Sequence, residues 1–258
     1  MDKKPESLSL LIPAYNEEEL LESSVEYYYS YLAQLMRVGK ISDFEIIICV
    51  NGSTNNTGYA AESISKKYKN VSFFETKQKG IGIALTLGIM KAKKDNITYM
   101  PGDGEYDASF IGYALEEIDE HSFIVGSRKI AGGYAGKNLL RKFLSHGLNF
   151  LTTTMFSSKA IESSGVKMFR KDWALRRVHS FRENGFPWQV EIMYYALLDG
   201  LKIKHVKSKT LHRRDISKSS VEILDTVYVL FNATLKYGFM LKREQIKRLL
   251  RLWSFRPG

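Results

Sequence analysis

The chain has 258 residues, of which 44% are hydrophobic, and it carries a formal net charge of +10. The hydrophobic content excludes a disordered chain, and the charge favours an anionic partner such as a nucleotide phosphate, a nucleic acid or an anionic membrane surface. Cys49 is the only cysteine, which excludes an intrachain disulfide and a cysteine-based zinc site.

The first hundred residues alternate between two kinds of apolar pattern. Short apolar runs that end at turn-forming residues predict strands over 7–13, 44–50, 71–75 and 97–100. Apolar residues spaced near 3.6 predict helices over 18–38, 59–68 and 80–92. Because strands and helices alternate, we expect an α/β fold with a Rossmann-like, mostly parallel sheet flanked by helices.

The second half of the chain is less regular. Helices are predicted over 108–120, 137–156 and 190–199, and strands over 122–127, 166–169 and 205–209. From residue 221 the composition changes, since 221–241 is apolar nearly all round and 242–253 forms a basic amphipathic pattern. We therefore expect a main domain over residues 1–220 and a C-terminal appendage over residues 221–258 that consists of an apolar helix and a basic amphipathic helix.

The appendage has two interpretations. A basic amphipathic helix fits the interface of an anionic bilayer, but it can equally pack on the domain with its basic face in water. The longest uncharged apolar run there, 226–235, is about half of the roughly 20 residues that span a bilayer. With no secretory signal visible, we expect a cytoplasmic protein, peripheral at the cytoplasmic face of the membrane.

Two polar groups follow predicted strands. Tyr15, Asn16 and Glu17 come directly after Pro13, and the acids of the Gly102–Asp107 turn follow the fourth strand. The carboxyl ends of parallel strands meet at one edge of a sheet, where α/β proteins bind ligands. Closely spaced carboxylates suit a divalent cation that bridges a diphosphate, although an acidic turn in water is the simpler interpretation.

Two further segments favour phosphate. Lys79 precedes glycines at the predicted start of a helix, where free backbone N–H groups bind anions. Arg128 follows a predicted strand, and Arg141 and Ser145 are four residues apart on one helix face. Together these three side chains would clamp one phosphate, although a solvated basic face would show the same pattern.

Taken in order, these motifs resemble family 2 glycosyltransferases of the GT-A fold, and among them the branch of dolichyl-phosphate mannose synthase and bacterial polyprenyl-phosphate sugar transferases. The resemblance covers about residues 7–220. The matching segments are Ile-Pro-Ala-Tyr-Asn-Glu at 12–17, Lys-Gly at 79–80, Gly-Ser-Arg at 126–128, Ser-Gly-Val-Lys-Met-Phe-Arg at 164–170, Gln-Val-Glu at 189–191 and Ser-Lys at 217–218.

The resemblance implies an inverting transfer of a sugar from a GDP- or UDP-sugar to a polyprenyl phosphate such as dolichyl or undecaprenyl phosphate. It implies a nucleotide-sugar site made by Pro13, Tyr15, Glu17, Asn51, Lys79 and Gly102. It implies a Mg²⁺ or Mn²⁺ ion held by Asp103, Glu105 and Gln189. The acceptor phosphate would be bound by Arg128, Arg141 and Ser145.

The implied catalytic residues are Asp103, Glu191, Arg213 and Arg214. An arginine near the leaving group would offset its developing negative charge. A phosphate acceptor needs no base, whereas a hydroxyl acceptor would need Glu191 or Asp103 as general base.

The chain departs from the family pattern at two places. Val50 and Asn51 stand where the family has two aspartates, and Pro101 replaces the first acid of its Asp-x-Asp motif, which leaves Asp103 and Glu105 as a shifted pair. Transfer to a glycan or lipid hydroxyl and a non-catalytic nucleotide-binding homologue therefore remain alternatives. No nucleic-acid-binding motif is present. The tyrosines at 27–29 and the appendage could serve either a homo-oligomer or core packing.

Overall fold

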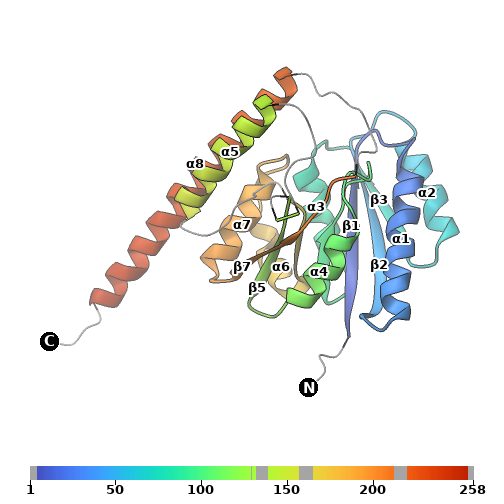
Figure 1. Ribbon diagram of the computed structural model, residues 1–258, viewed down its shortest axis with the longest axis horizontal. Helices are drawn as coiled ribbons and strands as arrows, with labels where there is room; N and C mark the ends of the chain where they lie inside the picture. Colours follow the sequence, from blue (N-terminus) through green and yellow to red (C-terminus); the bar gives the residue numbers. More distant parts are fainter. Residues whose placement is uncertain (1–4, 129, 132–138, 157–164, 212–219, 255–258) are drawn as a thin grey trace.

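The computed structural model describes residues 5–128, 130–131, 139–156, 165–211 and 220–254 (Figure 1). Its centre is a seven-stranded sheet with the order β3-β2-β1-β4-β6-β5-β7. Only β6 runs antiparallel to its neighbours. The predicted mostly parallel α/β fold is therefore confirmed. The strands are β1 (Glu6–Ala14), β2 (Ile41–Asn51), β3 (Val71–Thr76), β4 (Asn96–Tyr99), β5 (Ser122–Ser127), β6 (Lys167–Arg170) and β7 (Lys202–Lys207).

The helices lie on and beside this sheet, and two of them differ from the sequence prediction. They are α1 (Leu21–Arg37), α2 (Thr57–Lys67), α3 (Ile81–Lys91), α4 (Ser109–Glu117), α5 (Leu139–Phe156), α6 (Lys171–Arg177), α7 (Trp188–Leu198) and α8 (Ser220–Ser254). Helix α6, which continues into a short 3-10 turn at Val178–Ser180, was not predicted. The two C-terminal helices were predicted wrongly, because 220–254 forms one continuous helix.

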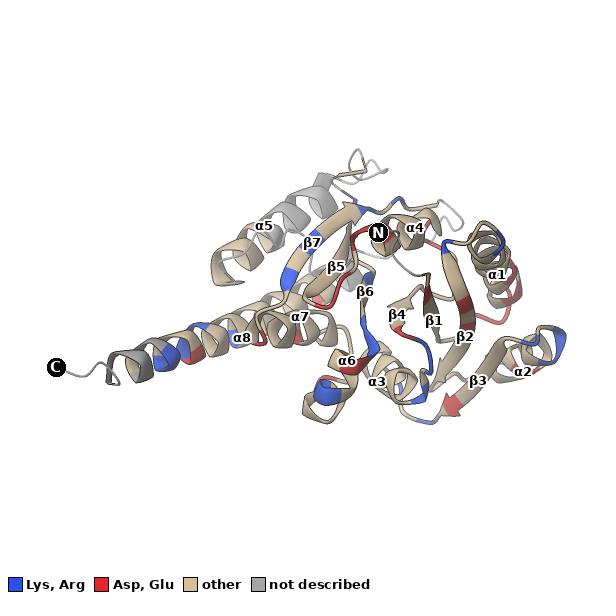
Figure 2. Ribbon diagram, turned by 90° about the horizontal axis from the view of Figure 1, so that it is seen from below, with Lys and Arg blue, Asp and Glu red and all other residues tan. Residues whose placement is uncertain are grey.

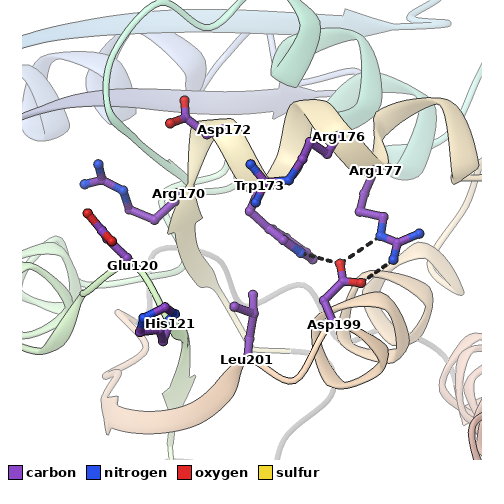
Figure 3. A pocket seen from close by; sticks show the side chains of 9 residues that line it. All are labelled: Glu120, His121, Arg170, Asp172, Trp173, Arg176, Arg177, Asp199 and Leu201. Atoms are coloured by element: carbon purple, nitrogen blue, oxygen red, sulfur yellow. Dashed lines mark hydrogen bonds and ion pairs between the residues drawn. The ribbon is translucent and has the colours of Figure 1, made fainter. Parts of the chain in front are cut away.

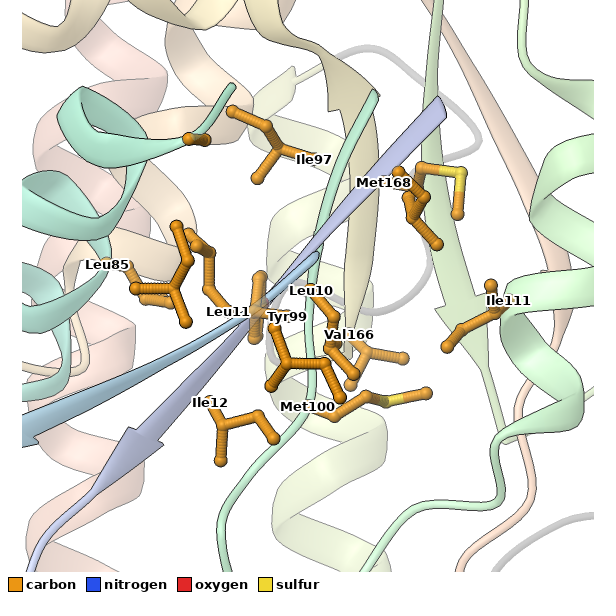
Figure 4. Packing of buried hydrophobic residues seen from close by; sticks show 14 of the residues in the cluster. Leu10, Leu11, Ile12, Leu85, Ile97, Tyr99, Met100, Ile111, Val166 and Met168 are labelled. Atoms are coloured by element: carbon orange, nitrogen blue, oxygen red, sulfur yellow. The ribbon is translucent and has the colours of Figure 1, made fainter. Parts of the chain in front are cut away.

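The core lies between the sheet and its helices (Figure 4). Leu10, Leu11 and Ile12 of β1 are fully buried, because β1 is a central strand covered on both faces. Helix α3 approaches closely at Gly88, where a Cβ would lie 3.0 Å from both Leu11 Cδ1 and Cys49 Sγ. Burial raises the pKa of the Cys49 thiol, which makes it a packing residue rather than a nucleophile.

The order of the strands reverses at β1. Strands β2 and β3 are added on one side of β1, and β4 pairs with its other side. Backbone hydrogen bonds continue past the end of β4, from Met100 N–H to Leu11 O at 3.0 Å and from Gly102 N–H to Pro13 O at 3.2 Å. The loops after β1, β2 and β4 therefore begin side by side at one edge of the sheet, the usual ligand-binding position in this architecture.

Helix α8 has its own small core against α5 and α7. The apolar residues of this second cluster are Leu148, Phe156, Val190, Tyr194, Leu230, Ala233, Tyr237 and Leu241. Gly238 lets α8 approach α5, because a Cβ there would lie 2.6 Å from Met155 Cβ. The C-terminal end of α8 projects beyond the body of the molecule (Figure 1). None of the helices in the described residues combines the length and apolarity that a membrane span requires.

The tyrosines at 27–29 are used for packing within the chain. Tyr28 is fully buried, and Tyr29 lies 5.3 Å from Phe44 and 4.5 Å from Tyr68 between ring centroids. The Tyr27 hydroxyl accepts a hydrogen bond from Ala108 N–H at 3.2 Å. These contacts explain the aromatic run as core packing of α1, the second of the two interpretations that the sequence left open.

Leu10→Ala should lower the free energy of unfolding by about 2–5 kcal/mol, because it leaves a cavity in a strand buried on both faces. Urea denaturation followed by circular dichroism measures this loss. Met36→Ala, at a position 41% exposed on α1, is the matched control. We expect the control to change stability by less than about 0.5 kcal/mol, and equal effects for the two variants would contradict the assignment of the core.

Candidate functional site

The loop after β1 is tied to the loop after β2. Asn16 adopts a φ of 54°, which lets its N–H donate to Ser53 Oγ at 3.1 Å while its Oδ1 accepts from Thr54 N–H at 2.8 Å. Glu17 N–H donates to Thr57 Oγ1 at 2.9 Å. These contacts fix Tyr15 and Glu17 at the carboxyl edge of the sheet, as the strand pattern predicts.

A tyrosine and a lysine meet at this edge. Lys79 Nζ donates to Tyr15 Oη at 3.0 Å and lies 4.1 Å from the centroid of its ring. Gly52 brings the loop after β2 against the same lysine, since a Cβ at its φ of 62° would lie 2.8 Å from the Lys79 backbone. Lys79 is exposed and Tyr15 half-buried, so both present polar atoms and an aromatic face to a ligand.

Asn51 is a cross-link under this corner. Its side chain is 3% exposed, and its Nδ2 donates to Ala14 O at 3.0 Å and Cys49 O at 3.3 Å. Its Oδ1 accepts from Gly80 N–H at 3.1 Å. The amide is therefore used within the protein, which does not support the predicted direct contact between Asn51 and a nucleotide. Its role is to join the ends of β1 and β2 to the start of α3.

The start of α3 is covered by protein. A Cβ at Gly80 or Gly82 would lie 2.2 Å from the carbonyl oxygen of Asn184 or Glu183, respectively. Ile83 N–H donates to Asn184 O at 3.1 Å. The 183–184 backbone thus occupies the space beside these glycines and takes up the Ile83 N–H, so the predicted phosphate contact of this helix start rests on the exposed Lys79.

The acidic turn lies next to the end of β1. Gly102 pairs with Pro13 as described above, and Asp103 Oδ1 accepts from Glu105 N–H at 2.9 Å. Gly104 closes the turn with a φ of 66°. Asp103 and Glu105 are only partly buried, so each keeps carboxylate oxygens available to a ligand.

The chain after β7 runs along the same turn. Leu211 N–H donates to Glu105 O, and Tyr106 forms an antiparallel bridge with Thr210. Leu211 precedes the predicted catalytic residues Arg213 and Arg214 by two and three positions. Both arginines lie outside the described residues, and their proposed role rests on the sequence and on this neighbouring backbone contact.

Gln189 is held by a buried lysine. Its Oε1 accepts from Lys167 Nζ at 2.5 Å and from the Tyr99 hydroxyl. Lys167 is fully buried, and its Nζ also donates to Gly165 O at 2.8 Å. The Lys167 ammonium therefore occupies the position next to Oε1 that a bound metal ion would take, and its positive charge would repel such an ion. The predicted use of Gln189 as a metal ligand is not supported.

This cluster lies under the acidic turn, since Tyr99 is the last residue of β4. Burial raises the pKa of the Tyr99 hydroxyl well above its usual value, which keeps it a neutral hydrogen-bond donor. Neither Tyr99 nor Lys167 is among the site residues predicted from the sequence. The one available signal was a lysine in an otherwise apolar strand, at position 167.

Glu191 is also buried and engaged. Its carboxylate accepts hydrogen bonds from Arg182 N–H at 2.9 Å, Glu183 N–H at 3.0 Å and the Tyr237 hydroxyl at 3.0 Å. These donors all come from the protein itself and engage both carboxylate oxygens, so the predicted use of Glu191 as general base is not supported. Instead, Glu191 holds the 182–184 segment in place.

These contacts link α8 to the ligand edge. Tyr237 bonds Glu191, which holds the segment whose Asn184 carbonyl accepts from the first turn of α3. The start of α3 in turn bonds Asn51, which donates to Ala14 at the end of β1. Five elements, namely α8, α7, α3, β2 and β1, therefore share one hydrogen-bonded support beneath Tyr15 and Lys79.

Arg128 belongs to the same edge of the sheet. It directly follows β5, and β5 runs parallel to β4 because both are antiparallel to β6. The carboxyl ends of β1, β4 and β5 thus face the same side, with Arg128 half-buried at the last of them. Arg141 and Ser145 lie in α5, and their side chains are outside the described residues.

Within the described residues, no group of three or more histidines, cysteines and acids has the arrangement of a metal site. Asp103 and Glu105 nevertheless fit a Mg²⁺ or Mn²⁺ ion that binds together with a diphosphate. Such ions commonly use one or two protein carboxylates and take their remaining ligands from phosphates and water.

A separate cavity of about 560 Å³ lies near the opposite edge of the sheet, and Figure 3 shows its side chains. It contains three arginines, at 170, 176 and 177. Arg177 is paired with Asp199, and Arg170 with Glu6. Because two of the three cations are neutralised by these ion pairs, the arginines explain local packing and do not define an anion site.

The chain belongs to glycosyl transferase family 2, whose sequence model matches residues 9–182. It is similar to the dolichyl-phosphate beta-glucosyltransferase of Drosophila melanogaster, with 27% identity over 205 residues that cover 73% of this chain and 62% of the relative. The human enzyme of the same name is 25% identical over 209 residues, which cover 76% of this chain and 64% of the relative. The chain thus spans less than two thirds of the length of these curated relatives.

Solved structures with the same fold include two synthases. Mannosyl-3-phosphoglycerate synthase from Rubrobacter xylanophilus aligns with a TM-score of 0.65 and 12% identity over 98% of this chain and 77% of its own. Glucosyl-3-phosphoglycerate synthase from Mycobacterium tuberculosis, in complex with Mn²⁺, UDP-glucose and phosphoglyceric acid, aligns with a TM-score of 0.64 and 13% identity over 90% and 80%. At this identity the comparison establishes the GT-A fold predicted from the sequence.

Tyr237→Phe should lower the free energy of unfolding by about 1–3 kcal/mol, because it removes the hydroxyl that lies between the buried carboxylate of Glu191 and the partly buried carboxylate of Glu183. Urea denaturation measures the loss. Tyr228→Phe makes the same change at a position exposed on the same helix and should be nearly neutral. A Tyr237→Phe variant as stable as the control would refute the proposed link between α8 and α7.

Proposed function

We propose that this protein is a glycosyltransferase that moves a sugar from a nucleotide-diphosphate sugar onto a polyprenyl phosphate. The observation that carries the proposal is the convergence of three groups at one edge of the sheet. These are the Tyr15–Lys79 pair, the carboxylates of Asp103 and Glu105, and Arg128. Membership of glycosyl transferase family 2 and the names of the curated relatives support it.

The donor would bind across the ends of β1 and β4. The Tyr15 ring offers a stacking face for a nucleoside, and the Lys79 ammonium offers a counter-charge for phosphate. Pro13, Gly102 and Glu17 would line the same site. A divalent ion held by Asp103, Glu105 and the donor's own diphosphate would offset negative charge on the leaving group.

The acceptor would be a phosphate rather than a hydroxyl. A phosphate oxygen is already anionic near neutral pH, so it can attack the anomeric carbon without a general base. The new carbon–oxygen bond forms on one face as the bond to the nucleoside diphosphate breaks on the other, which inverts the anomeric configuration. The hydrogen bonds that engage Glu191 favour this acceptor, because they leave Asp103 as the other of the two predicted bases for a hydroxyl, and Asp103 would be held by the metal ion.

Arg128, with Arg141 and Ser145 of α5, would bind the acceptor phosphate, and Arg213 or Arg214 would offset charge on the leaving diphosphate. Glucose is the sugar we propose, because the curated relatives are named beta-glucosyltransferases. The reaction would take place where polyprenyl phosphate is available, at a membrane surface, on the cytoplasmic face that the sequence predicts.

One observation favours a second function. Pro101 replaces an acid of the family motif, which is the change expected of a homologue that binds nucleotide without catalysis. The following experiments separate the two functions, because the first measures nucleotide binding and the second measures product.

UDP or GDP together with Mn²⁺ should raise the melting temperature of the protein, since a ligand of the native state stabilises it by mass action. At about 100 times the dissociation constant the expected rise is about 5–10 °C for a domain of this size. Asp103→Asn should remove the Mn²⁺-dependent part, whereas Asp172→Asn, an exposed control on α6, should keep it. No shift with either nucleotide would contradict the proposed donor site.

Arg128→Ala combined with Arg141→Ala should reduce the transfer of labelled sugar to a short-chain polyprenyl phosphate by at least about tenfold, while nucleotide binding remains. The product should release its sugar in mild acid, as a phosphate-linked sugar does. Arg37→Ala with Arg176→Ala, both exposed, is the charge-matched control. Undiminished product in the Arg128–Arg141 double variant would contradict the assignment of the acceptor site. Nucleotide binding without any product in the wild-type protein would favour the non-catalytic function.

A further inference from the structure

The outward face of α8 is a long apolar stripe. One side of the helix packs on α5 and α7, and the other side exposes Tyr228, Phe239, Ile246 and Leu250, which are 68%, 62%, 57% and 62% exposed. At 3.6 residues per turn these four side chains lie within about 40° of one another, along about 33 Å of helix. We call these four residues the α8 stripe.

Basic residues border the α8 stripe. Lys242 and Arg243 lie between Phe239 and Ile246, one to each side, and neither forms an ion pair with another described residue. Residues 220–254 contain six lysines and arginines against three acids. Figure 2 shows Lys and Arg positions in blue along the part of α8 that projects from the body.

We propose that the α8 stripe and its basic border dock the protein on an anionic bilayer, with α8 lying in the plane of the interface. The combination of apolar anchors with flanking cations is the pattern that binds the boundary between anionic headgroups and acyl chains. A second copy of the chain fits less well, because pairing two such stripes would bring their cations together. Docking concerns the location of the protein and does not depend on glycosyl transfer.

The structure also ties this surface to the ligand edge. Tyr237 lies on the buried side of α8, opposite the stripe, and bonds Glu191 beneath the site. A helix held in the interface would therefore fix the orientation of the carboxyl edge of the sheet relative to the membrane. The acceptor that we propose above has its phosphate at that same surface, so docking would bring the site and the phosphate together.

Co-sedimentation of the full chain with vesicles tests the docking surface. We expect binding to vesicles of phosphatidylcholine with phosphatidylglycerol and much weaker binding to phosphatidylcholine alone. Phe239→Glu with Ile246→Glu should weaken binding to the anionic vesicles by at least about tenfold, because both apolar anchors are lost. Met90→Glu with Leu175→Glu makes the same change at exposed apolar positions on α3 and α6 and should bind as the wild type does.

Lys242→Ala with Arg243→Ala separates the charge from the stripe. The affinity of this variant for anionic vesicles should fall about tenfold, whereas its weak affinity for neutral vesicles should not change. Circular dichroism and nucleotide-dependent thermal shifts check that each variant is folded and keeps its ligand site. Three results would overturn the proposal: no binding of the wild type to anionic vesicles, equal loss in the Met90–Leu175 variant, or a wild-type dimer that the Phe239–Ile246 variant converts to a monomer without any vesicle binding.

Discussion

The buried carboxylate of Glu191 is the group on which the geometry of the site depends. A carboxylate without partners would be very unfavourable in the interior, and here two backbone amides and a tyrosine hydroxyl compensate its burial. These donors come from the 182–183 backbone and from α8, so the anion draws both toward α7. The 183–184 carbonyls then fill the space left by Gly80 and Gly82, which sets the position of α3 and hence of Lys79.

Helix α7 also supports the ligand edge through a second buried polar side chain, Gln189. Gln189 bonds Lys167 of β6 and Tyr99 of β4, directly before the acidic turn. Breaking such a buried polar cluster leaves uncompensated groups, whereas the intact cluster permits only one arrangement of its members. Gln189 and Glu191 therefore position the two halves of the ligand edge from beneath, and the groups that we propose to contact a ligand are the more exposed Tyr15, Lys79, Asp103 and Glu105.

Helix α8 contacts the hydrogen-bonded support of the site with one face and exposes its other face to the outside of the protein. The buried face supplies Tyr237 to Glu191, and the opposite face carries the α8 stripe. An enzyme that uses a lipid phosphate has to present its site to a bilayer at a defined height and angle. The docking that we propose, through a continuous helix packed on the body along one side and apolar along the other, would meet that requirement.

The sequence by itself determined the alternation of strands and helices, the mostly parallel sheet and the edge at which Tyr15, Asp103 and Arg128 meet. These follow from local patterns, since apolar period, turn residues and the rule for carboxyl ends require no knowledge of distant contacts. Only the tertiary structure decided what Asn51, Gln189 and Glu191 do. The chemistry of these side chains alone suits a ligand. Their actual partners are distant in the sequence, because Tyr237 is 46 residues from Glu191 and Lys167 is 22 residues from Gln189. A buried polar side chain bonds whatever donor or acceptor folding brings to it, and one continuous α8 and the filled start of α3 arise from the same long-range packing.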